Sequence, residues 1–418
     1  PYKHNRRSAP RSSVQLKVSY FEEGGESPLC LPRGRTLRKR SDRLIPLHRI
    51  ANHAVIRNST PLISGHFVLH GADFEMPDAD FVAKFGMQAA ADMVLDFHCF
   101  HPQLPFLYDA RQLAAFLSTS RQKLLYYARH TAAAYHPVTI PERNGDVRIL
   151  SVPDDTLRRW QRKICRELLA YLPVAPQATA YRKGGAISGN AAPHVGKRYL
   201  LKLDISDFFG SICFEQVHST AFHTRYFSRQ VGFLLTSLCC KDGVLPQGAP
   251  TSPALSNLVM RNFDTNMARW CQRRAIVYTR YCDDLTFSAD RPLFAVYSKA
   301  KNMLAEMGFD LNEAKTHFIT NAGRQSVTGL TVNEKVSVPA GYKRSLRQEV
   351  YYALRFGLAD SILRGGHAAL RTDGVPDTER YRQQLLGRVQ YVLQIEPENR
   401  WFREAKQKLL SCDDLPKV

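Results

Sequence analysis

The sequence predicts an α+β fold, in which an antiparallel sheet is combined with separate helices. An apolar strand at residues 198–203 is followed by two helical segments, and two short strands then flank the acidic pair Asp283–Asp284. This order of strand, helices, paired strands and helix is typical of an α+β unit. The chain has 418 residues, 44% of them hydrophobic, which is enough for one large domain or for two to three subdomains.

The composition indicates a partner rich in phosphate groups. Lys and Arg number 58 against 38 Asp and Glu, which gives a formal charge of +20. Charge alone does not identify the partner, because a basic surface can simply be solvated. The nine cysteines form no CxxC pair and no Cys/His cluster with zinc spacing, so we expect a reduced, intracellular chain without a structural metal. No apolar run approaches the roughly 20 residues that span a bilayer, so the expected setting is cytoplasmic, with no membrane partner.

The N-terminal part divides into an arm, helices and a hairpin. Residues 1–75 are rich in Arg, Ser, Gly and Pro, and we expect a poorly ordered basic arm there, or alternatively an RNA-binding extension. Residues 109–130 and 154–172 carry apolar residues at helical spacing. Between them, residues 138–152 read as two strands around a turn at Asn144 and Gly145.

The remaining elements follow from the same patterns of apolar residues and turn residues. Two strands are expected within residues 275–289, interrupted by the paired acids. Helices are expected, wholly or largely, at residues 214–240, 253–273, 293–307, 344–363, 378–393 and 399–410.

The strongest chemical signal is the string from Tyr281 through Cys282 to the acids Asp283 and Asp284. Two adjacent carboxylates at a strand turn offer hard oxygen ligands that suit Mg²⁺. Taken alone, such a pair is more often an ordinary turn. A third acid, Asp204, ends the apolar strand, where a carboxylate is expensive to bury unless it is paired or holds a metal. Phosphoryl transfer by two metal ions about 4 Å apart needs carboxylates of this kind.

A loop rich in small residues lies between these acids in the sequence. It runs from Leu245 to Pro253, and its Gly248 and Ala249 would let the backbone lie close to a nucleotide or a template base. Ser252 and Pro253 are good residues for the start of the next helix. The alternative is an ordinary Pro/Gly connector.

Together, these segments resemble the reverse transcriptase family, whose palm carries an acid-bearing strand, a PQG loop and a [YF]xDD turn in this order. The resemblance covers about residues 109–410 and implies a right-hand polymerase that synthesises DNA on an RNA template with two Mg²⁺ ions. It also implies a division of the chain. We expect N-terminal helices and fingers in residues 76–197, a palm with an antiparallel sheet and helices in residues 198–338, and a helical thumb in residues 339–418.

The resemblance assigns a role to each matching residue. It implies that Asp204, Asp283 and Asp284 are catalytic metal ligands, with Ile205 in the same metal site, and that Lys315 protonates pyrophosphate. The dNTP would be bound by four further residues. Gln247 would lie near the template and the dNTP, Phe209 would block a ribose 2′-OH, and the triphosphate would be held by Arg143 and Arg148.

Two further strings are similar to motifs of retron reverse transcriptases. Residues Asn190 to His194 look like the NAxxH motif, and Val327, Thr328 and Gly329 look like the VTG motif. By itself His194 would more often be a capping or core residue. Within a polymerase frame we expect both motifs to bind RNA, together with Arg347. The expected thumb would hold duplex phosphates through Lys343, Arg344, Arg347 and Arg355.

Resemblance to retrons also implies partners. A cognate structured noncoding RNA of the msr-msd type would be both primer and template, with synthesis starting from a guanosine 2′-OH and giving branched RNA-linked single-stranded DNA. A separate effector protein would act with it in antiphage defence, and the host ribonuclease H would trim the template. The alternatives are a group II intron or diversity-generating reverse transcriptase, or a catalytically idle RNA-binding protein with a polymerase fold. Cys282 departs from the alanine that is commonest at its position.

Overall fold

The computed structural model describes residues 79–141, 147–365 and 375–411, together with the backbone of four short strands nearer the N-terminus. These strands form two antiparallel pairs, β1 with β4 and β2 with β3. The expected basic arm otherwise lies outside the described residues, as does the expected turn at Asn144 and Gly145. The bounds of the four strands are β1 (Lys17–Val18), β2 (Leu37–Arg38), β3 (Leu44–Ile45) and β4 (Ile63–His66).

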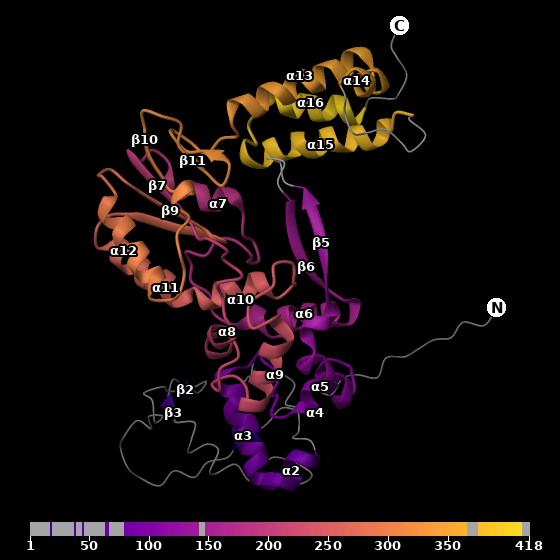
Figure 1. Cartoon of the computed structure of the whole chain (residues 1–418), viewed down its shortest axis with the longest axis vertical. Helices are drawn as coiled ribbons and strands as arrows, with labels where there is room; N and C mark the ends of the chain where they lie inside the picture. Colours follow the sequence, from indigo (N-terminus) through magenta and orange to yellow (C-terminus); the bar gives the residue numbers. More distant parts are fainter. Residues whose placement is uncertain are drawn as a thin grey trace, which may run out of the picture. The chain divides into compact units, whose positions relative to one another are not determined.

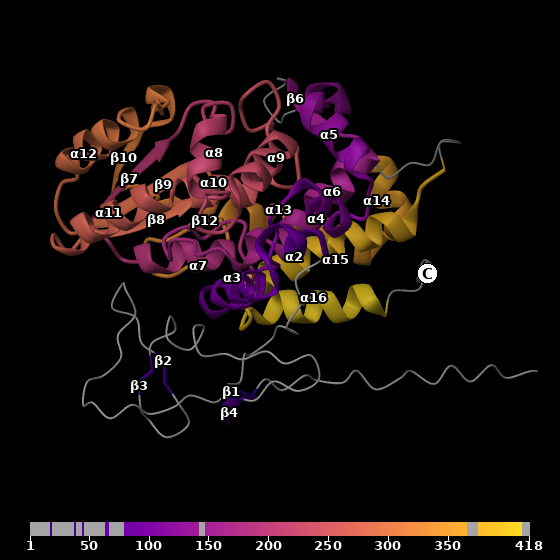
Figure 2. The same ribbon diagram turned by 90° about the horizontal axis from the view of Figure 1, so that it is seen from below.

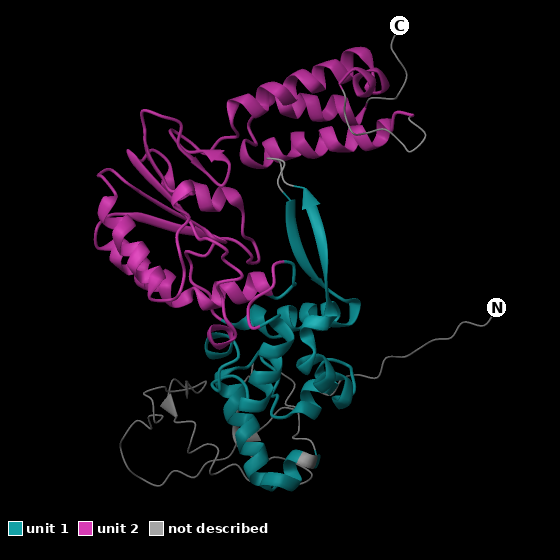
Figure 3. Ribbon diagram, in the orientation of Figure 1, with its two compact units in different colours: residues 1–172, 218–242, 248–251 teal, residues 173–217, 243–247, 252–418 magenta. Residues whose placement is uncertain are grey.

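The chain forms two compact units (Figure 3). Unit 1 consists of residues 1–172, 218–242 and 248–251. Unit 2 consists of residues 173–217, 243–247 and 252–418. One boundary falls inside helix α8 (Phe214–Thr220), and two others fall within the loop from Leu245 to Pro253.

From residue 79 onwards, the described part of unit 1 consists of helices, one hairpin and the loops that connect them. Strands β5 (Tyr135–Pro141) and β6 (Val147–Pro153) pair over seven residues each, which confirms the two strands predicted there. Several helices begin at side-chain caps, as where Asp154 accepts a hydrogen bond from the Leu157 amide. The helices are α2 (Ala79–Phe85), α3 (Met87–Phe100), α4 (Ala110–Phe116), α5 (Arg121–Arg129), α6 (Asp155–Glu167) and α9 (Arg229–Cys239).

Unit 2 is built on a four-stranded antiparallel sheet with the strand order β10-β7-β9-β8. Figure 1 labels three of these strands, β10, β7 and β9. Strand β7 (Tyr199–Asp204) and the pair β8 (Val277–Tyr281) and β9 (Asp284–Ala289) confirm the predicted strands. The edge strand β10 (His317–Thr320) was not predicted. Its residues are mostly exposed, so they lack the apolar alternation that marks a half-buried strand.

The two faces of this sheet are covered by different helices. Thr279 and Ser288 point to one face and bond to His194, which ends the segment formed by α7 (Ile187–Ala191) and η3 (Ala192–His194). Tyr278 points to the reverse face, because side chains alternate along a strand, and it contacts Phe263 of α11. Three further helices of unit 2 are α10 (Ser252–Val259) and α11 (Arg261–Gln272), which precede β8, and α12 (Phe294–Ala305), which follows β9.

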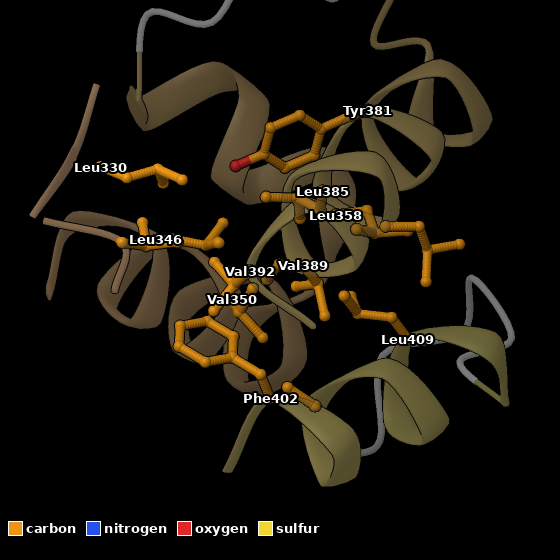
Figure 4. Packing of buried hydrophobic residues seen from close by; sticks show 14 of the residues in the cluster. Leu330, Leu346, Val350, Leu358, Tyr381, Leu385, Val389, Val392, Phe402 and Leu409 are labelled. Atoms are coloured by element: carbon orange, nitrogen blue, oxygen red, sulfur yellow. The ribbon is translucent and has the colours of Figure 1, made fainter. Parts of the chain in front are cut away.

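The C-terminal helices of unit 2 enclose a large apolar core. Figure 4 shows side chains from several helices, including Leu346, Leu385 and Phe402, gathered around one another, and these three are fully buried. Figure 2 gives a second view of these helices. They are α13 (Ala340–Phe356), α14 (Leu358–Gly365), α15 (Thr378–Ile395) and α16 (Arg400–Leu410). Of the helices that the structure describes, none is long and apolar enough to cross a membrane.

Backbone breaks divide several of the predicted helices. The helix predicted at residues 344–363 is two helices, because Gly357 takes φ +91° between α13 and α14. Ser118, with φ +55°, likewise separates α4 from α5 within residues 109–130. Gly86, with φ +81°, separates the unpredicted helices α2 and α3. The spacing of apolar residues predicts that a stretch is helical, but it does not predict the residue at which the helix is interrupted.

Candidate active site

The backbone brings the three predicted acids to one end of the sheet. Asp204 and Asp284 are direct partners in the register of β7 and β9, on the same face of the sheet. Asp283 lies in the turn before Asp284, and its carbonyl accepts a hydrogen bond from the Ile205 amide at 3.2 Å. Cross-strand partners have Cβ atoms about 5 Å apart. The predicted grouping of the acids is therefore present in the backbone.

The local charges make this end of the sheet suited to a cation. Partial burial raises the pKa of Asp284, and the neighbouring charges of Asp283 and Asp204 raise it further, against the opposing effect of Lys202 and Lys315. A divalent cation would relieve this crowding, and carboxylate oxygens are its preferred ligands. The donor chemistry therefore fits a divalent metal ion. Within residues 79–141, 147–365 and 375–411, no three Asp, Glu, His or Cys side chains are already gathered around one point in the way a bound metal would require.

Lys315 lies beside the first of these acids. Its Nζ is 3.2 Å from Oδ1 and 3.3 Å from Oδ2 of Asp204, whose side chain is only 12% exposed. The short helix η4 (Glu313–Lys315) is held there because the Asn312 amide donates to the Asp204 carbonyl at 2.8 Å. Ile205 is buried, so only its carbonyl, and not its side chain, has the chemistry to contact a metal.

Phe209 and Gln247 are both half-buried in unit 2. The Phe209 ring lies against Phe208, with ring centroids 5.5 Å apart. Gln247 precedes Gly248, which takes φ +122° and where an added Cβ would lie 2.7 Å from the Ser151 carbonyl. Only glycine fits at that position, because the loop backbone approaches strand β6 closely there. The predicted approach to a nucleotide or template base stays a prediction.

The two arginines predicted to hold a triphosphate belong to the hairpin of unit 1. Arg148 is exposed on β6. Arg143 lies outside the described residues. The triphosphate role of both stays a prediction.

Within the NAxxH string, Asn190, Ala191 and His194 are buried, whereas Ala192 and Pro193 are exposed. His194 accepts or donates hydrogen bonds at both ring nitrogens, with Ser288 Oγ at 2.7 Å and Thr279 Oγ1 at 2.8 Å. Burial lowers the pKa of His194 to about 4. Asn190 is fully buried, and its Oδ1 accepts a hydrogen bond from Thr179 Oγ1 at 2.8 Å. As placed, neither side chain offers surface to an RNA, which differs from the direct contact that the sequence led us to expect.

The VTG string forms the turn of a small hairpin that packs on the NAxxH helix. Strands β11 (Ser326–Val327) and β12 (Leu330–Thr331) are joined by Thr328 and Gly329, with φ +46° and +79°. Two positive φ angles are typical of a type I′ turn. Thr328 Oγ1 donates to the Ile187 carbonyl at the start of α7 at 3.1 Å. Val327 is buried, whereas Gly329 is exposed.

The basic residues of α13 differ in their surroundings. Arg347 is exposed, and its guanidinium lies 5.7 Å from the ring centroid of Trp401. Lys343, in contrast, forms an ion pair with Glu396 at 2.6 Å in which both side chains are largely buried. The ammonium of Lys343 is thus already paired inside the protein, and its expected contact with duplex phosphate stays a prediction.

Sequence reasoning did not single out two buried charged residues beside the acid turn. Arg280 and Asp264 have no exposed side-chain surface and form an ion pair at 2.7 Å. The one available signal was an arginine in the middle of the otherwise uncharged strand β8.

Comparison with known proteins identifies the family. Residues 140–343 match the family model described as reverse transcriptase (RNA-dependent DNA polymerase), and this range contains all three acids. The chain is 34% identical over 319 residues to the retron Mx65 reverse transcriptase of Myxococcus xanthus, covering 71% of this chain and 70% of that protein. The chain belongs to the retron reverse transcriptases. The retron Ec86 reverse transcriptase of Escherichia coli is 30% identical over 258 residues, which cover 60% of this chain and 79% of that one.

This retron reverse transcriptase is an RNA-directed DNA polymerase with the right-hand fold. The family predicted from its motifs is confirmed, and reverse transcriptases use divalent metal ions. Among solved structures, telomerase from Candida albicans aligns with a TM-score of 0.36 and 11% identity, covering 82% of this chain and 70% of that chain.

Proposed function

We propose that this retron reverse transcriptase copies a cognate structured noncoding RNA of the msr-msd type, which serves as both primer and template. Synthesis starts from a guanosine 2′-OH and gives branched RNA-linked single-stranded DNA. The observation that carries the proposal is that unit 2 contains the three acids and both retron motifs around one sheet. A folded RNA held by the motif region would thus be bound by the same unit that carries the acids.

The three acids hold two Mg²⁺ ions in this proposal. Asp204 contributes from the end of β7, Asp283 and Asp284 contribute from the turn, and the Ile205 carbonyl is a further ligand. Ions held by these residues would supply Lewis-acid stabilisation for the priming hydroxyl and for the leaving pyrophosphate. The chain itself holds the carboxylates in fixed places, which reduces the reorganisation needed during the reaction.

Lys315 and Phe209 have separate roles in each nucleotide addition, the first in proton transfer and the second in sugar selection. The ammonium of Lys315 lies next to Asp204, which supports its assignment as the proton donor to the leaving pyrophosphate. The Phe209 ring follows β7 closely and excludes a ribose 2′-OH, so dNTPs are chosen over ribonucleotides. Gln247 contacts the template and the dNTP, and Arg143 and Arg148 bind its triphosphate.

RNA recognition is divided between exposed and buried residues. Gly329 and the half-buried Thr328 present the hairpin turn to the RNA, and the exposed Arg347 binds its phosphates. The buried residues Asn190, His194 and Val327 affect RNA binding indirectly. They stabilise helix α7 and the β11–β12 hairpin, which contains the turn. Folded RNA is recognised by shape and by exposed loop bases, which suits a rigid turn.

The product acts in antiphage defence together with a separate effector protein, and the host ribonuclease H removes template RNA. The resemblance to retrons supports these last assignments. They are tested by co-expressing the enzyme and its RNA with the neighbouring genes and measuring phage plating.

Priming is tested by comparing two reactions of the purified enzyme. One uses RNA transcribed from the DNA that flanks its gene, and the other uses a DNA primer annealed to an unrelated RNA. We expect a product from the first reaction whose RNA–DNA junction is cleaved by an enzyme specific for 2′–5′ linkages. If the enzyme extends the annealed primer but the first reaction gives no product with such a junction, the priming proposal is contradicted while the polymerase assignment stays intact.

A matched pair of glycine variants tests the turn. Gly329 and Gly308 take φ +79° and +80°, and an added Cβ meets nothing within 4 Å at either site. Gly329→Ala and Gly308→Ala therefore impose the same backbone strain. We expect Gly329→Ala to reduce branched product more than annealed-primer extension, and Gly308→Ala to change both equally. A parallel loss of both reactions in Gly329→Ala would show that the turn supports the fold only.

A further inference from the structure

A buried ion pair lies behind the acid turn. The side chains of Arg280 and Asp264 are both fully buried, and Arg280 is the largest fully buried side chain described. Arg280 Nη2 lies 2.7 Å from Asp264 Oδ2, and Nε lies 2.9 Å from Oδ1. Burying two charges is expensive unless the geometry is good and the remaining polar atoms are satisfied. Tyr278 meets this need in part, because its hydroxyl donates to Asp264 Oδ1 at 2.7 Å.

The other nitrogens of Arg280 connect the ion pair to the turn. Nη1 donates to the carbonyl of Cys282 at 2.8 Å, and Nη2 donates to Asn257 Oδ1 at 3.1 Å. The planar guanidinium thus joins helices α10 and α11 to the peptide that immediately precedes Asp283. Lysine could not replace it, because a single ammonium cannot reach acceptors placed around a rigid fork.

The turn needs such support because its backbone is strained. Cys282 takes φ +60°, a conformation that L-residues other than Asn and Asp rarely adopt. Its carbonyl is held by Arg280, and the next carbonyl, that of Asp283, is held by the Ile205 amide of the strand that carries Asp204. Both peptides of the turn are therefore fixed, one to the helices behind the sheet and one to the first acid strand.

The side chain of Arg280 does not itself reach the acids' face of the sheet. Arg280 pairs with Leu285 in the register, whereas Tyr281 pairs with Asp284, so Arg280 and Asp284 point to opposite faces. Arg280 is therefore linked to the acids by contact only through the backbone of the turn.

We infer that Arg280 is a positioning residue, which with Asp264 fixes the Cys282–Asp283 peptide so that the carboxylates of Asp283 and Asp284 are pre-arranged for divalent cations. The inference rests on the metal-binding role proposed above for these acids. Residues that hold a metal ligand in place without touching the metal strongly affect metal affinity in other sites.

The test uses variants that remove the support without leaving a buried charge unpaired. Arg280→Gln combined with Asp264→Asn replaces the ion pair by a neutral pair that is too short to reach Cys282. Arg280→Lys keeps the charge but loses the fork. The control combines Arg388→Gln with Glu349→Gln, which removes an ion pair between α15 and α13, away from the sheet. The full chain is titrated with Mn²⁺ and bound metal is followed by electron paramagnetic resonance, with thermal unfolding and primer extension measured in parallel.

We expect the Arg280–Asp264 double variant to weaken Mn²⁺ binding by about tenfold or more, with extension partly restored at high metal concentration. The control should bind Mn²⁺ like the wild type. A folded double variant with unchanged Mn²⁺ affinity would overturn the inference. If the double variant does not fold, the Mn²⁺ affinity of Arg280→Lys is measured instead, and an unchanged affinity would overturn the inference. The Asp283→Asn variant distinguishes the positioning role of Arg280 from the metal-binding role of the acids. Unchanged Mn²⁺ binding in that variant would contradict the proposed metal site itself.

Discussion

Asp204 and Asp284 are direct cross-strand partners in the antiparallel pair of β7 and β9. Like charges placed opposite each other destabilise a sheet, so this arrangement needs compensation. Lys315 supplies part of it through its contact with Asp204. A site of this kind is stable when it binds cations, which connects the geometry of the sheet to the chemistry proposed for it.

Replacing Lys315 by Met should reduce the maximal rate of extension by roughly 100-fold, the usual contribution of a general acid. Stability should hardly change, because the lysine side chain is 62% exposed. Lys301→Met is the matched control, since Lys301 also forms an exposed ion pair, with Glu313 at 2.7 Å. Single-turnover extension measures the effect. A rate for Lys315→Met within twofold of the Lys301→Met rate would contradict a role in proton transfer.

Phe209→Val should raise the incorporation of ribonucleotides relative to dNTPs by about tenfold or more, because a smaller side chain leaves room for a 2′-OH. Competition between a dNTP and the matching ribonucleotide on an annealed primer measures the ratio. Phe208→Leu is the comparison, since Phe208 is the buried neighbour of the pair. Unchanged selectivity in Phe209→Val would show that the ring only fills space.

The stability of the protein should fall in acid partly because of His194. Its pKa is lowered from 6.5 to about 4 by burial, so the folded state resists protonation more than the unfolded chain does. The full contribution is therefore present above pH 6.5, and about 3 kcal/mol of unfolding free energy is lost as the pH falls towards 4. Urea unfolding of wild type and His194→Gln between pH 7.5 and 4.5 measures this difference. The prediction fails if both proteins lose stability with the same slope.

Removing residues 1–75 should leave extension of an annealed primer intact. These residues lack the periodic apolar pattern that would build them into a core, and the match to the reverse transcriptase family begins at residue 140. Specific activity and solubility of the truncated and full chains are compared directly. An insoluble or inactive truncation would show that the arm is part of the folded enzyme.

The acid-bearing strands could be predicted because their signals are local. A run such as Tyr199 to Asp204 carries both its strand pattern and its acid within a few residues. The pairing of Arg280 with Asp264 could not be predicted, since it depends on how α11 packs on the sheet. His194 shows the same limit. The residue matches a sequence motif, but its hydrogen bonds to Thr279 and Ser288 can be seen only in the folded structure.

The most direct test of the account compares Asp204→Asn, Asp283→Asn and Asp284→Asn with wild type in the extension of an annealed primer. Each change removes a charge from a proposed metal ligand but keeps its size. We expect each rate to fall by about 1000-fold, since metal stabilisation is worth several kcal/mol, with folding and RNA binding unchanged. Near-normal DNA synthesis by the Asp283→Asn or Asp284→Asn enzyme would contradict the assignment of the acid turn as the polymerase centre.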